Sequence, residues 1–539
     1  MKRHHPFCAP CATQVPLPSK QHLSATRAPP VPLPMQNDVY PRTRTRVARP
    51  QRLIAALIAS LATLLAHAAP SVALVVNTTA DAGDPTCATT CSLRQAIMNI
   101  APGGTISFDP AILPGVIVLQ QGALVVINKS MTISGPGAEQ LAIDGNLTDR
   151  IFRIGNPGAG VPMAVTMSGL SLVNGRDVVA DGSPGAAGTG SAGGAGSQAR
   201  GGCIELADGS LRLSDVALRS CAAQGGAGGS GGSGAPNPSK AGGVGGVGGD
   251  GGQALGGAIF AWPQTALVLQ RTSIVDAHAI AGPGGKGGNG GDGLFLGVGG
   301  SGGNGGGALG GAIFLAQVYQ FGAINVTIAQ SSAQGAKGGN GGSGDPDFSM
   351  SHGGDGGDGG YARGGLQFGD TSGFPPQVLD VAFSTLGEGV VTPGLHGSGG
   401  RAATAGGPGQ DGSASAAAFA MVGSPAPMFV EHSVIFGPPS PPLCTGPVVG
   451  QFSVASDGSC PAFQVAAVDS WFKTLDPTRA MAGYEPRFGA PAIDATGCLT
   501  NVAFPDPFVS DMRGTPRPQG SACDLGAIEA DYVFVGEFD

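Results

Sequence analysis

Four polar side chains recur at nearly constant spacing in the middle of the 539-residue chain. Asp250, Asn304, Asp358 and Asp411 follow one another at intervals of 54, 54 and 53 residues. Equal spacing in a repeated sequence predicts one corner of successive units, and oxygen ligands of this kind are those that Ca²⁺ prefers. Because stacked carboxylates repel unless water or a cation lies between them, we expect an exposed ladder with at most weak calcium binding.

A second calcium pattern surrounds Asp292. Residues 287–295 fit the nine-residue pattern G-G-x-G-x-D-x-U-x, in which turns of adjacent coils supply oxygen ligands to one ion. Sites of that kind need tandem copies, whereas this chain holds isolated ones in a glycine-rich background where chance matches are expected. The sequence predicts no cofactor beyond weakly bound calcium, and its candidate ligands are Asp250, Asp292, Asn304, Asp358 and Asp411.

Few of the remaining charged residues are candidates for catalysis. Glycoside hydrolysis needs two carboxylates that face one cleft, and a polysaccharide lyase needs a base together with a cation that neutralises the uronate. The basic residues of the repeated region occur singly. The histidines are isolated too, and we expect them in solvent or in turns: His278, His352, His396 and His432. The sequence therefore predicts no catalytic residue.

These side chains belong to an array whose unit is 54 residues long. The hexapeptide Leu-Gly-Gly-Ala-Ile-Phe at 255–260 recurs at 309–314, and Arg363 begins a related copy 54 residues later. Second apolar runs with β-branched residues follow the copies, and each leads into a small-residue bend; they lie at 211–218, 267–274, 321–328 and 378–383. Strands that recur once per unit without a crossover helix predict a parallel β-helix. A β-sandwich would explain the strands but not the period.

Glycine is concentrated in the same region. Of the 97 glycines, 72 lie between residues 181 and 412. The runs break phase every few residues, which excludes a collagen triple helix. Two interpretations stay open: the tracts are entropic loops on a stable solenoid, or they pack as extended, polyproline-II-like strands that form a flat patch. Such a patch would suit a glycan or another cell-surface polymer.

The flanking regions fit the same architecture. Between 105 and 173 short apolar strands alternate with turns, as the first coils of a solenoid would. An amphipathic segment from Ser92 to Ile100 predicts a helix that covers the open end. We therefore divide the chain into an extension with signal peptide, an N-terminal cap with first coils, glycine-rich coils, a C-terminal cap and an acidic, aromatic tail; the boundaries are 1–68, 69–180, 181–440, 441–530 and 531–539.

The two ends resemble a known group of proteins. The run Cys-Ser-Leu-Arg-Gln-Ala-Ile at 91–97 is similar to the CSLREA motif of bacterial secreted right-handed β-helix proteins. The segments 490–494, 511–518 and 523–529 resemble the choice-of-anchor Q region of the same proteins, and the Gly-Gly-Ala-Ile units resemble polymorphic outer-membrane proteins. The resemblance implies an all-β fold: a right-handed, single-stranded parallel β-helix with glycine-rich loop insertions and terminal caps.

Charged residues near the C-terminus mix both signs over a short segment. We interpret them as ion pairs and turn caps that close the last coil, rather than as catalytic groups; they are Asp494, Asp511, Arg513, Arg517, Asp524 and Glu529.

The N-terminus and the cysteines indicate export. Five arginines from Arg42 to Arg52 precede an apolar run at 53–66 and the small-residue pattern Ala-His-Ala, as in a secretory signal peptide. Cleavage would leave eight cysteines, for which proximity in the sequence suggests four disulfides: Cys87 with Cys91, Cys203 with Cys221, Cys444 with Cys460, and Cys498 with Cys523.

Charge and composition narrow the partners. The chain beyond residue 68 holds 19 basic and 35 acidic residues. Its net charge of −16 argues against a basic surface that would bind nucleic acid. Beyond the signal we expect no transmembrane segment. The sequence predicts a secreted or cell-surface protein with a structural or adhesive role, and its expected partner is a cell-surface polysaccharide or a host surface. A polysaccharide lyase or glycoside hydrolase on the same scaffold is the alternative.

Overall fold

The computed structural model describes residues 73–530 except 84–85, 88, 127–128, 157–162, 296, 348, 373–377, 424–426 and 499–509. All described residues belong to one compact unit, which begins at Ala69. The predicted segments 69–180, 181–440 and 441–530 fall within this unit. The predicted signal peptide and the tail 531–539 lie outside the described residues.

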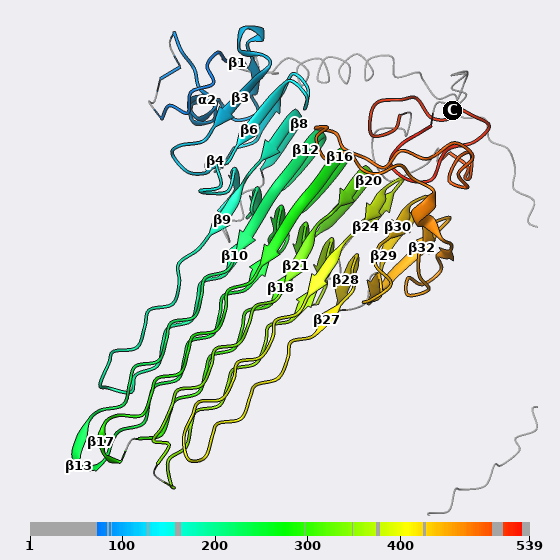
Figure 1. Ribbon diagram of the computed structural model, residues 1–539. Helices are drawn as coiled ribbons and strands as arrows, with labels where there is room; N and C mark the ends of the chain where they lie inside the picture. The colour runs from blue at the N-terminus through cyan, green and yellow to red at the C-terminus, as the bar shows by residue number, and fades with distance from the viewer. Residues whose placement is uncertain are drawn as a thin grey trace, which may run out of the picture. The chain divides into compact units, whose positions relative to one another are not determined.

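Parallel strands wind into the predicted β-helix (Figure 1). The largest sheet has 19 strands: β1 Ala73–Val76, β2 Thr105–Phe108, β3 Gly115–Val118, β5 Met131–Ser134, β6 Leu141–Asp144, β8 Ala164–Val173, β9 Arg176–Val178, β12 Ser210–Gln224, β16 Ala266–Ile280, β20 Gln320–Ala329, β21 Ser332–Gln334, β24 Val378–Ala382, β25 Thr385–Gly387, β26 Val390–Thr392, β29 Met428–Glu431, β30 Val434–Phe436, β32 Val448–Gln451, β33 Val454–Ala455 and β34 Gln464–Val465.

Two smaller sheets complete the coils. An eight-stranded sheet contains β4 Leu124–Val126, β7 Phe152–Ile154, β11 Ile204–Leu206, β15 Ile259–Ala261, β19 Ile313–Ala316, β23 Gln367–Asp370, β28 Phe419–Val422 and β31 Cys444–Thr445. A five-stranded sheet contains β10 Ala199–Arg200, β14 Ala254–Leu255, β18 Ala308–Leu309, β22 Ala362–Arg363 and β27 Ala414–Ser415. A separate pair joins β13 Asn237–Ala241 and β17 Gly293–Phe295.

The 54-residue sequence unit is one coil of the solenoid. Ile259 of β15 pairs in register with Ile313 of β19, and both side chains are fully buried inside the coil. On the outer side of the same strands the rings of Phe260 and Phe314 stack with their centroids 5.2 Å apart. Like side chains therefore lie directly above one another, which buries an apolar ladder that no single coil could cover.

Each coil turns a tight corner at the Gly-Gly-Ala step. Gly256 and Gly310 have φ values of 64° and 66°, in the left-handed region that favours glycine. A Cβ atom on Gly256 would also lie 2.1 Å from the carbonyl oxygen of Ile259. The repeated glycine is thus required by both backbone conformation and space.

The two longest strands, β12 and β16, bend around coil corners without losing their pairing. In β16 the bends occur at Arg271 and Asp276, whose φ values are 43° and 58°. The small-residue segment after Asp276, which we predicted as a bend that ends the strand, instead continues pairing, because Ala277 and His278 remain in register with Cys221 and the following residue of β12. One left-handed residue turns the chain while its neighbours keep their hydrogen bonds.

The N-terminal end is covered as predicted by a short helix, α2 Leu93–Asn99. Ser92 is its N-cap and forms a reciprocal capping box with Gln95, which satisfies two backbone amides that the helix leaves free. Leu93, Ala96 and Ile97 are buried against the first coil. A single 3₁₀ turn follows β2 at Pro110–Ile112.

The opposite end continues into a segment that we call the C-terminal strap, the described residues of 468–530. It starts with a 3₁₀ turn at Val468–Ser470 and crosses the outer face of the 19-stranded sheet. The Ala527 amide donates to Thr385 of β25 at 3.0 Å, and Ser273 of β16 donates to the carbonyl of Ala482 at 2.7 Å. The strap therefore contacts several coils rather than only the last one.

Four disulfides join the cysteine pairs that we predicted. They are Cys87–Cys91, Cys203–Cys221, Cys444–Cys460 and Cys498–Cys523. Each closes a loop of at most 25 residues in sequence separation, so each fastens one local turn or coil.

Candidate binding surface

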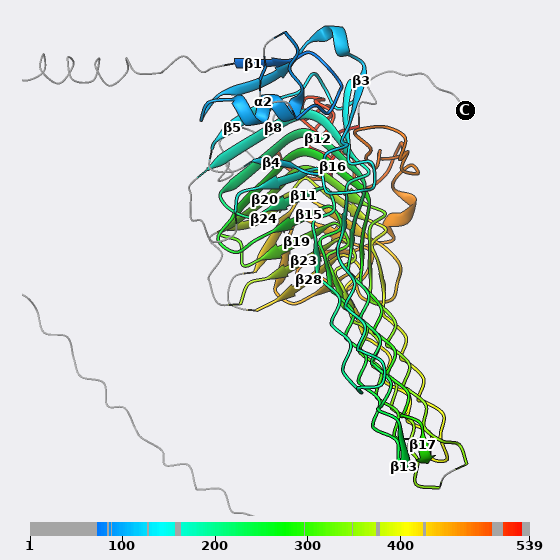
Figure 2. The ribbon, with the colours of Figure 1, turned by 90° about the vertical axis from the view of Figure 1, so that its left-hand side faces the viewer.

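Five glycine-rich excursions leave consecutive coils and run side by side as one projection, which we call the glycine arm (Figures 1 and 2). They occupy residues 181–198, 225–253, 282–307, 335–361 and 394–413. Each consists of an outgoing tract and a return tract, and β13 and β17 pair at the tip. The arm is part of the same compact unit as the coils.

Neighbouring tracts of one layer are joined by backbone hydrogen bonds at every third residue. The amide of Gly231 donates to the carbonyl of Lys286 in the next coil at 2.8 Å, and Gly287 donates to Asn340 one coil further at 2.8 Å. The return tracts repeat this pattern, since Gly248 donates to the next return tract at 2.9 Å. Each layer is thus a continuous hydrogen-bonded array.

A second set of bonds joins the outgoing layer to the return layer. Gly288 donates to the carbonyl of Gly246, Gly246 donates to Gly232, and Gly232 donates to Ser191, each at 2.8 Å. Two of every three residues therefore use their amide inside the arm. The glycine tracts are ordered and laminated, as in the second of the two interpretations that the sequence left open.

Close packing explains why those two residues are glycine. A Cβ atom on Gly287 would lie 1.9 Å from the carbonyl oxygen of Gly300, and one on Gly288 would lie 2.0 Å from that of Gly232. The third residue, Asn289, is exposed. A three-residue period of this kind is that of the polyproline-II helix, whose side chains at every third position share one face.

The arm consequently has two outer faces made of third residues. The outgoing face carries Ala227, Ser230, Ser233, Pro283, Lys286, Asn289, Lys337, Asn340, Ser343, Leu395, Ser398 and Arg401. The return face carries Val244, Val247, Asp250, Val298, Ser301, Asn304, His352, Asp355, Asp358, Thr404, Gly407 and Gln410. The two faces differ in charge: the outgoing face carries three cationic side chains and two aspartates, Asp181 and Asp292, whereas the described return tracts carry three aspartates on their face and no Lys or Arg.

An apolar patch lies beside the aspartates of the return face. Val244, Val247 and Val298 are 61%, 49% and 37% exposed. Val244 and Val298 lie in adjacent tracts, because the amide that follows Val244 donates to the carbonyl of Val298 at 2.9 Å. Exposed apolar groups that cluster on a rigid surface indicate a contact site.

The predicted polar ladder is present in three of its four members. Oδ1 of Asp250 accepts from the Asn304 amide at 2.7 Å, and Oδ1 of Asn304 accepts from the Asp358 amide at 2.9 Å. The prediction for Asp411 is wrong, because Oδ1 of Asp358 accepts from Gln410 at 2.7 Å. The last unit is shorter than the others, so Gln410 occupies the ladder position and Asp411 is the residue after it.

These side chains have a structural role that the sequence did not indicate. The amide of a third residue points away from the arm interior, and the ladder supplies its acceptor from the preceding coil. Asp411 instead accepts from the amide and the ring of His396, and Asp292 is exposed where the third excursion approaches its tip. Among the described residues, no three His, Cys, Asp or Glu side chains gather as a metal site would require.

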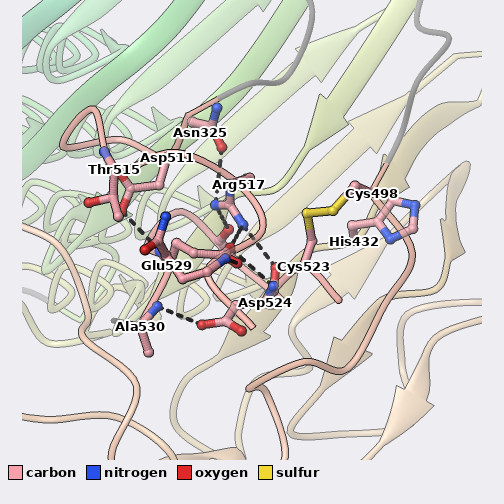
Figure 3. Close-up of polar contacts among 12 residues, drawn as sticks. Asn325, His432, Cys498, Asp511, Thr515, Arg517, Cys523, Asp524, Glu529 and Ala530 are labelled. Atoms are coloured by element: carbon pink, nitrogen blue, oxygen red, sulfur yellow. Dashed lines mark hydrogen bonds and ion pairs between the residues drawn. A yellow bond between two sulfur atoms is a disulfide. The ribbon is translucent and has the colours of Figure 1, made fainter. Parts of the chain in front are cut away.

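The cap residues form a buried network between the strap and the coils (Figure 3). Arg517 donates to Glu529 at 2.6 Å and to the carbonyl of Gly526 at 2.8 Å, and its guanidinium lies 4.7 Å from the ring centroid of Phe383. Its second nitrogen also reaches Asn325 of β20 at 3.2 Å. The arginine therefore ties the strap to two neighbouring coils.

The acidic cap residues accept backbone amides. Asp511 accepts from Arg513 at 2.8 Å and, with its other oxygen, from Glu529 at 2.9 Å. Asp524 accepts from Asp494 at 2.8 Å, and Asp494 accepts from the amide of residue 522 at 2.9 Å. The side chain of Arg513 pairs with Glu485 at the surface. These contacts are ion pairs and turn caps, but they fasten the strap to the outer face of internal coils, whereas we expected them to close the last coil.

His432 differs from the solvated histidine that we expected. It is 3% exposed and its ring stacks between Phe383 and Phe452, at centroid distances of 4.9 and 5.2 Å. Burial, together with the nearby charge of Arg517, lowers the pKa of His432 to about 4. The other three histidines are at least partly exposed.

This burial makes the stability of the cap depend on pH. Because the folded pKa of His432 lies below the ordinary value of 6.5, the unfolded chain binds the extra proton between pH 6.5 and 4. The variant His432→Asn removes the titrating group and suits the left-handed backbone at this position. As the pH falls through that interval, we expect the free energy of unfolding of the wild type to drop by on the order of 2–3 kcal/mol more than that of the variant. Denaturant unfolding at pH 7, 5.5 and 4.5 measures the difference, and parallel pH profiles would contradict it.

A charged cluster at the base of the arm escaped the sequence analysis. Arg150 bonds to Asp177 at 2.5 Å and to Glu205, which also accepts from the indole nitrogen of Trp262 at 2.9 Å. The Arg200 guanidinium stacks 5.0 Å from a ring centroid of Trp262. Arg150 and Glu205 are 55 residues apart, which is about one coil. Opposite charges at that spacing are the sequence signal from which the pair could have been predicted.

One carboxylate pair lies outside these networks. Asp380 of β24 pairs in register with Phe429 of β29, so Asp380 and Glu431 are diagonal neighbours on the outer face of the sheet. Diagonal neighbours on a sheet are about 7–8 Å apart. Burial raises the pKa of Asp380, and burial followed by the charge of Asp380 raises the pKa of Glu431. The pair is one that the sequence analysis did not single out.

Comparisons with known proteins assign neither a family nor a function to the chain. No protein-family model matches the chain, and no curated protein does. Among solved structures the chain is similar to the crystal structure of pectate lyase Pel9A, with 11% identity, a TM-score of 0.26, and coverage of 85% of this chain and 96% of that chain. The described residues include no helix that is long and apolar enough to span a bilayer. The stacked parallel sheets show that the chain is a parallel β-helix.

Proposed function

We propose that the protein is a secreted or cell-surface adhesive protein that binds polysaccharide with its glycine arm. The observation that supports this most is the hydrogen-bonded arm itself, in which two glycines per triplet form the interior and every third side chain is exposed. A rigid surface binds with a smaller entropic cost than a flexible loop would. The four disulfides agree with an extracellular location.

The return face is the face we assign to binding. Its exposed valines offer a flat apolar area for the C–H faces of sugar rings, and Asp250, the next exposed position after Val247 in the same tract, can accept hydrogen bonds from hydroxyl groups. Among the described third residues of the outgoing face, Leu395 is the one large apolar side chain of comparable exposure, at 65%. Anchoring, and any motif-based link to the choice-of-anchor proteins, stays a prediction.

A hydrolase is the second candidate, and Asp380 with Glu431 is the observation that favours it. Two carboxyl groups about 5–9.5 Å apart are the usual arrangement for glycoside hydrolysis. A raised pKa on both would let one act as the acid. If this candidate is correct, the purified protein releases reducing ends and Asp380→Asn abolishes the release.

Binding and turnover are separable in one experiment. On a polysaccharide array we expect the wild type to bind without releasing reducing ends. We expect the double variant Val244→Glu/Val298→Glu to bind at least tenfold more weakly, because the variant puts charge into the apolar patch. The matched control Ser230→Glu/Ser398→Glu changes third residues on the other face and is expected to stay within twofold. Equal losses in both variants, or a silent array, would contradict the proposal.

A further inference from the structure

A cavity of about 400 Å³ lies where the C-terminal strap crosses the coils, and none of its lining residues belongs to the glycine arm. Its walls include Asn174, Arg219, Ser220, Asp276, Gln330 and Pro477. Ligand-binding cavities in proteins commonly measure about 300–1,000 Å³. A second cavity of about 280 Å³ shares Arg219 with it and is bounded by the next strap residues, Thr478 and Ala480.

The polar wall is built from residues at one corner of successive coils. Asn174, Ser220, Asp276 and Gln330 all have left-handed backbones, with φ values of 55°, 52°, 58° and 51°. Each is the left-handed residue at which its coil turns the corner, so the backbone holds its side chain in one direction. The corner therefore holds a row of polar side chains in fixed positions beside the strap.

Arg219 has hydrogen-bonding capacity left over. One of its terminal nitrogens donates to the carbonyls of Pro477 and Thr478 at 3.2 and 3.1 Å. Its Nε is buried and has no hydrogen-bond partner among the described residues. Because a buried nitrogen is shielded from the cavity, the group left for a ligand oxygen is the second terminal nitrogen of Arg219, which donates to no described residue.

Asp276 supplies a fixed acceptor in the same cavity. Its two oxygens contact the Ser220 hydroxyl and the His278 ring, each at 2.8 Å, and half of its side chain stays exposed. The hydrogen bond from His278 is the main cause that lowers the pKa of Asp276, so the group is a carboxylate at neutral pH. The lining therefore carries one formal charge of each sign, on Arg219 and Asp276.

The remaining lining fits a neutral ligand with hydroxyl groups. The Gln330 amide presents both a donor and an acceptor, and no hydrogen bond joins its side chain to another described residue. Val173, Val275 and Pro477 supply apolar contacts. A sugar ring has the matching composition, since its hydroxyls donate and accept while its C–H face is apolar.

We propose that this cavity is a saccharide-binding site for a neutral sugar unit, independent of the glycine arm. The two cavities on either side of Arg219 suggest an extended site that holds more than one ring. The strap forms one wall, so binding and the position of the strap are linked.

Calorimetric titration of the full chain with cellobiose, maltose and digalacturonate tests the proposal. We expect a neutral disaccharide to bind, and Asp276→Asn and Gln330→Ala each to weaken it at least tenfold. Gln330→Asn keeps an amide and suits the left-handed backbone, so it is expected to retain affinity within threefold.

Controls separate this site from the arm. Asp250→Asn and Val244→Glu/Val298→Glu change the arm alone, and we expect them to leave disaccharide binding unchanged. The proposal is overturned if neither neutral disaccharide binds, if digalacturonate binds in their place, or if the cavity variants bind as well as the wild type. The polysaccharide array tests binding by the glycine arm, whereas calorimetry with disaccharides tests the cavity. Failure of the cavity proposal is therefore distinguishable from failure of the proposed function.

Discussion

Replacing Arg517 with alanine is expected to lower the free energy of unfolding by about 3–5 kcal/mol. The side chains of Arg517 and Glu529 are 0% and 1% exposed, so the variant would leave a carboxylate buried without its cation. Burial already raises the pKa of Glu529. We expect the deficit to shrink as the pH is lowered toward 4, because the orphaned carboxylate then takes up a proton.

The matched control is Arg513→Ala in the same strap. Its ion pair with Glu485 is exposed by 27% and 29%, and exposed pairs contribute about 0–1 kcal/mol. Denaturant unfolding of both variants at pH 7 and pH 4.5 gives the comparison. Equal losses at pH 7 would show that the cap does not depend on the buried pair. Near-native stability of Arg517→Met/Glu529→Gln would support the pair as the source of the loss.

Two adjacent glycines should respond to alanine in opposite directions. A Cβ atom on Gly406 would lie 2.0 Å from the carbonyl oxygen of Gly354, whereas one on Gly407 would meet only a side-chain oxygen of Asp355 at 3.5 Å. Neither glycine has a positive φ. We expect Gly406→Ala to destabilise the arm by on the order of 3 kcal/mol and Gly407→Ala to stabilise it by about 0.4–1 kcal/mol.

Hydrogen exchange of the arm measures this contrast. In the wild type the interior amides of 335–361 and 394–413 should be protected, and Gly406→Ala should remove protection from both tracts that contact the new methyl group. Gly407→Ala should leave the pattern unchanged. Loss of protection in both variants, or in neither, would mean that the close approach does not determine which positions are glycine.

The sequence predicted the coils because their signal is local and repeated. The offset between 255–260 and 309–314 is one turn of the solenoid, and the alternation of apolar residues specifies which side faces inward. The capping helix was predictable from Ser92 and its amphipathic pattern. The disulfide pairs were also predictable, since each joins cysteines near one another in the sequence.

Other features depend on contacts between distant segments, which periodicity does not encode. The strap brings Pro477 to Arg219 across 258 residues, so the cavity beside them has no sequence signal. His432 is isolated in the sequence and is buried because Phe383 and Phe452 occupy the same corner of neighbouring coils. The error at Asp411 arose from a shorter last unit, which shifts the ladder by one residue.

The triplet pattern of the glycine arm limits the insertions and deletions that its tracts can accept. An insertion or deletion of three residues changes a tract by one turn, about 9.3 Å, and keeps each exposed position exposed. A change of one or two residues would turn side chains such as Lys286 and Asn289 toward carbonyl oxygens that lie about 2 Å from where a Cβ atom on the present glycines would be. Apart from the turn at its tip, each tract can therefore vary in length only in steps of three, while the chemistry of its exposed face is free to change one residue at a time.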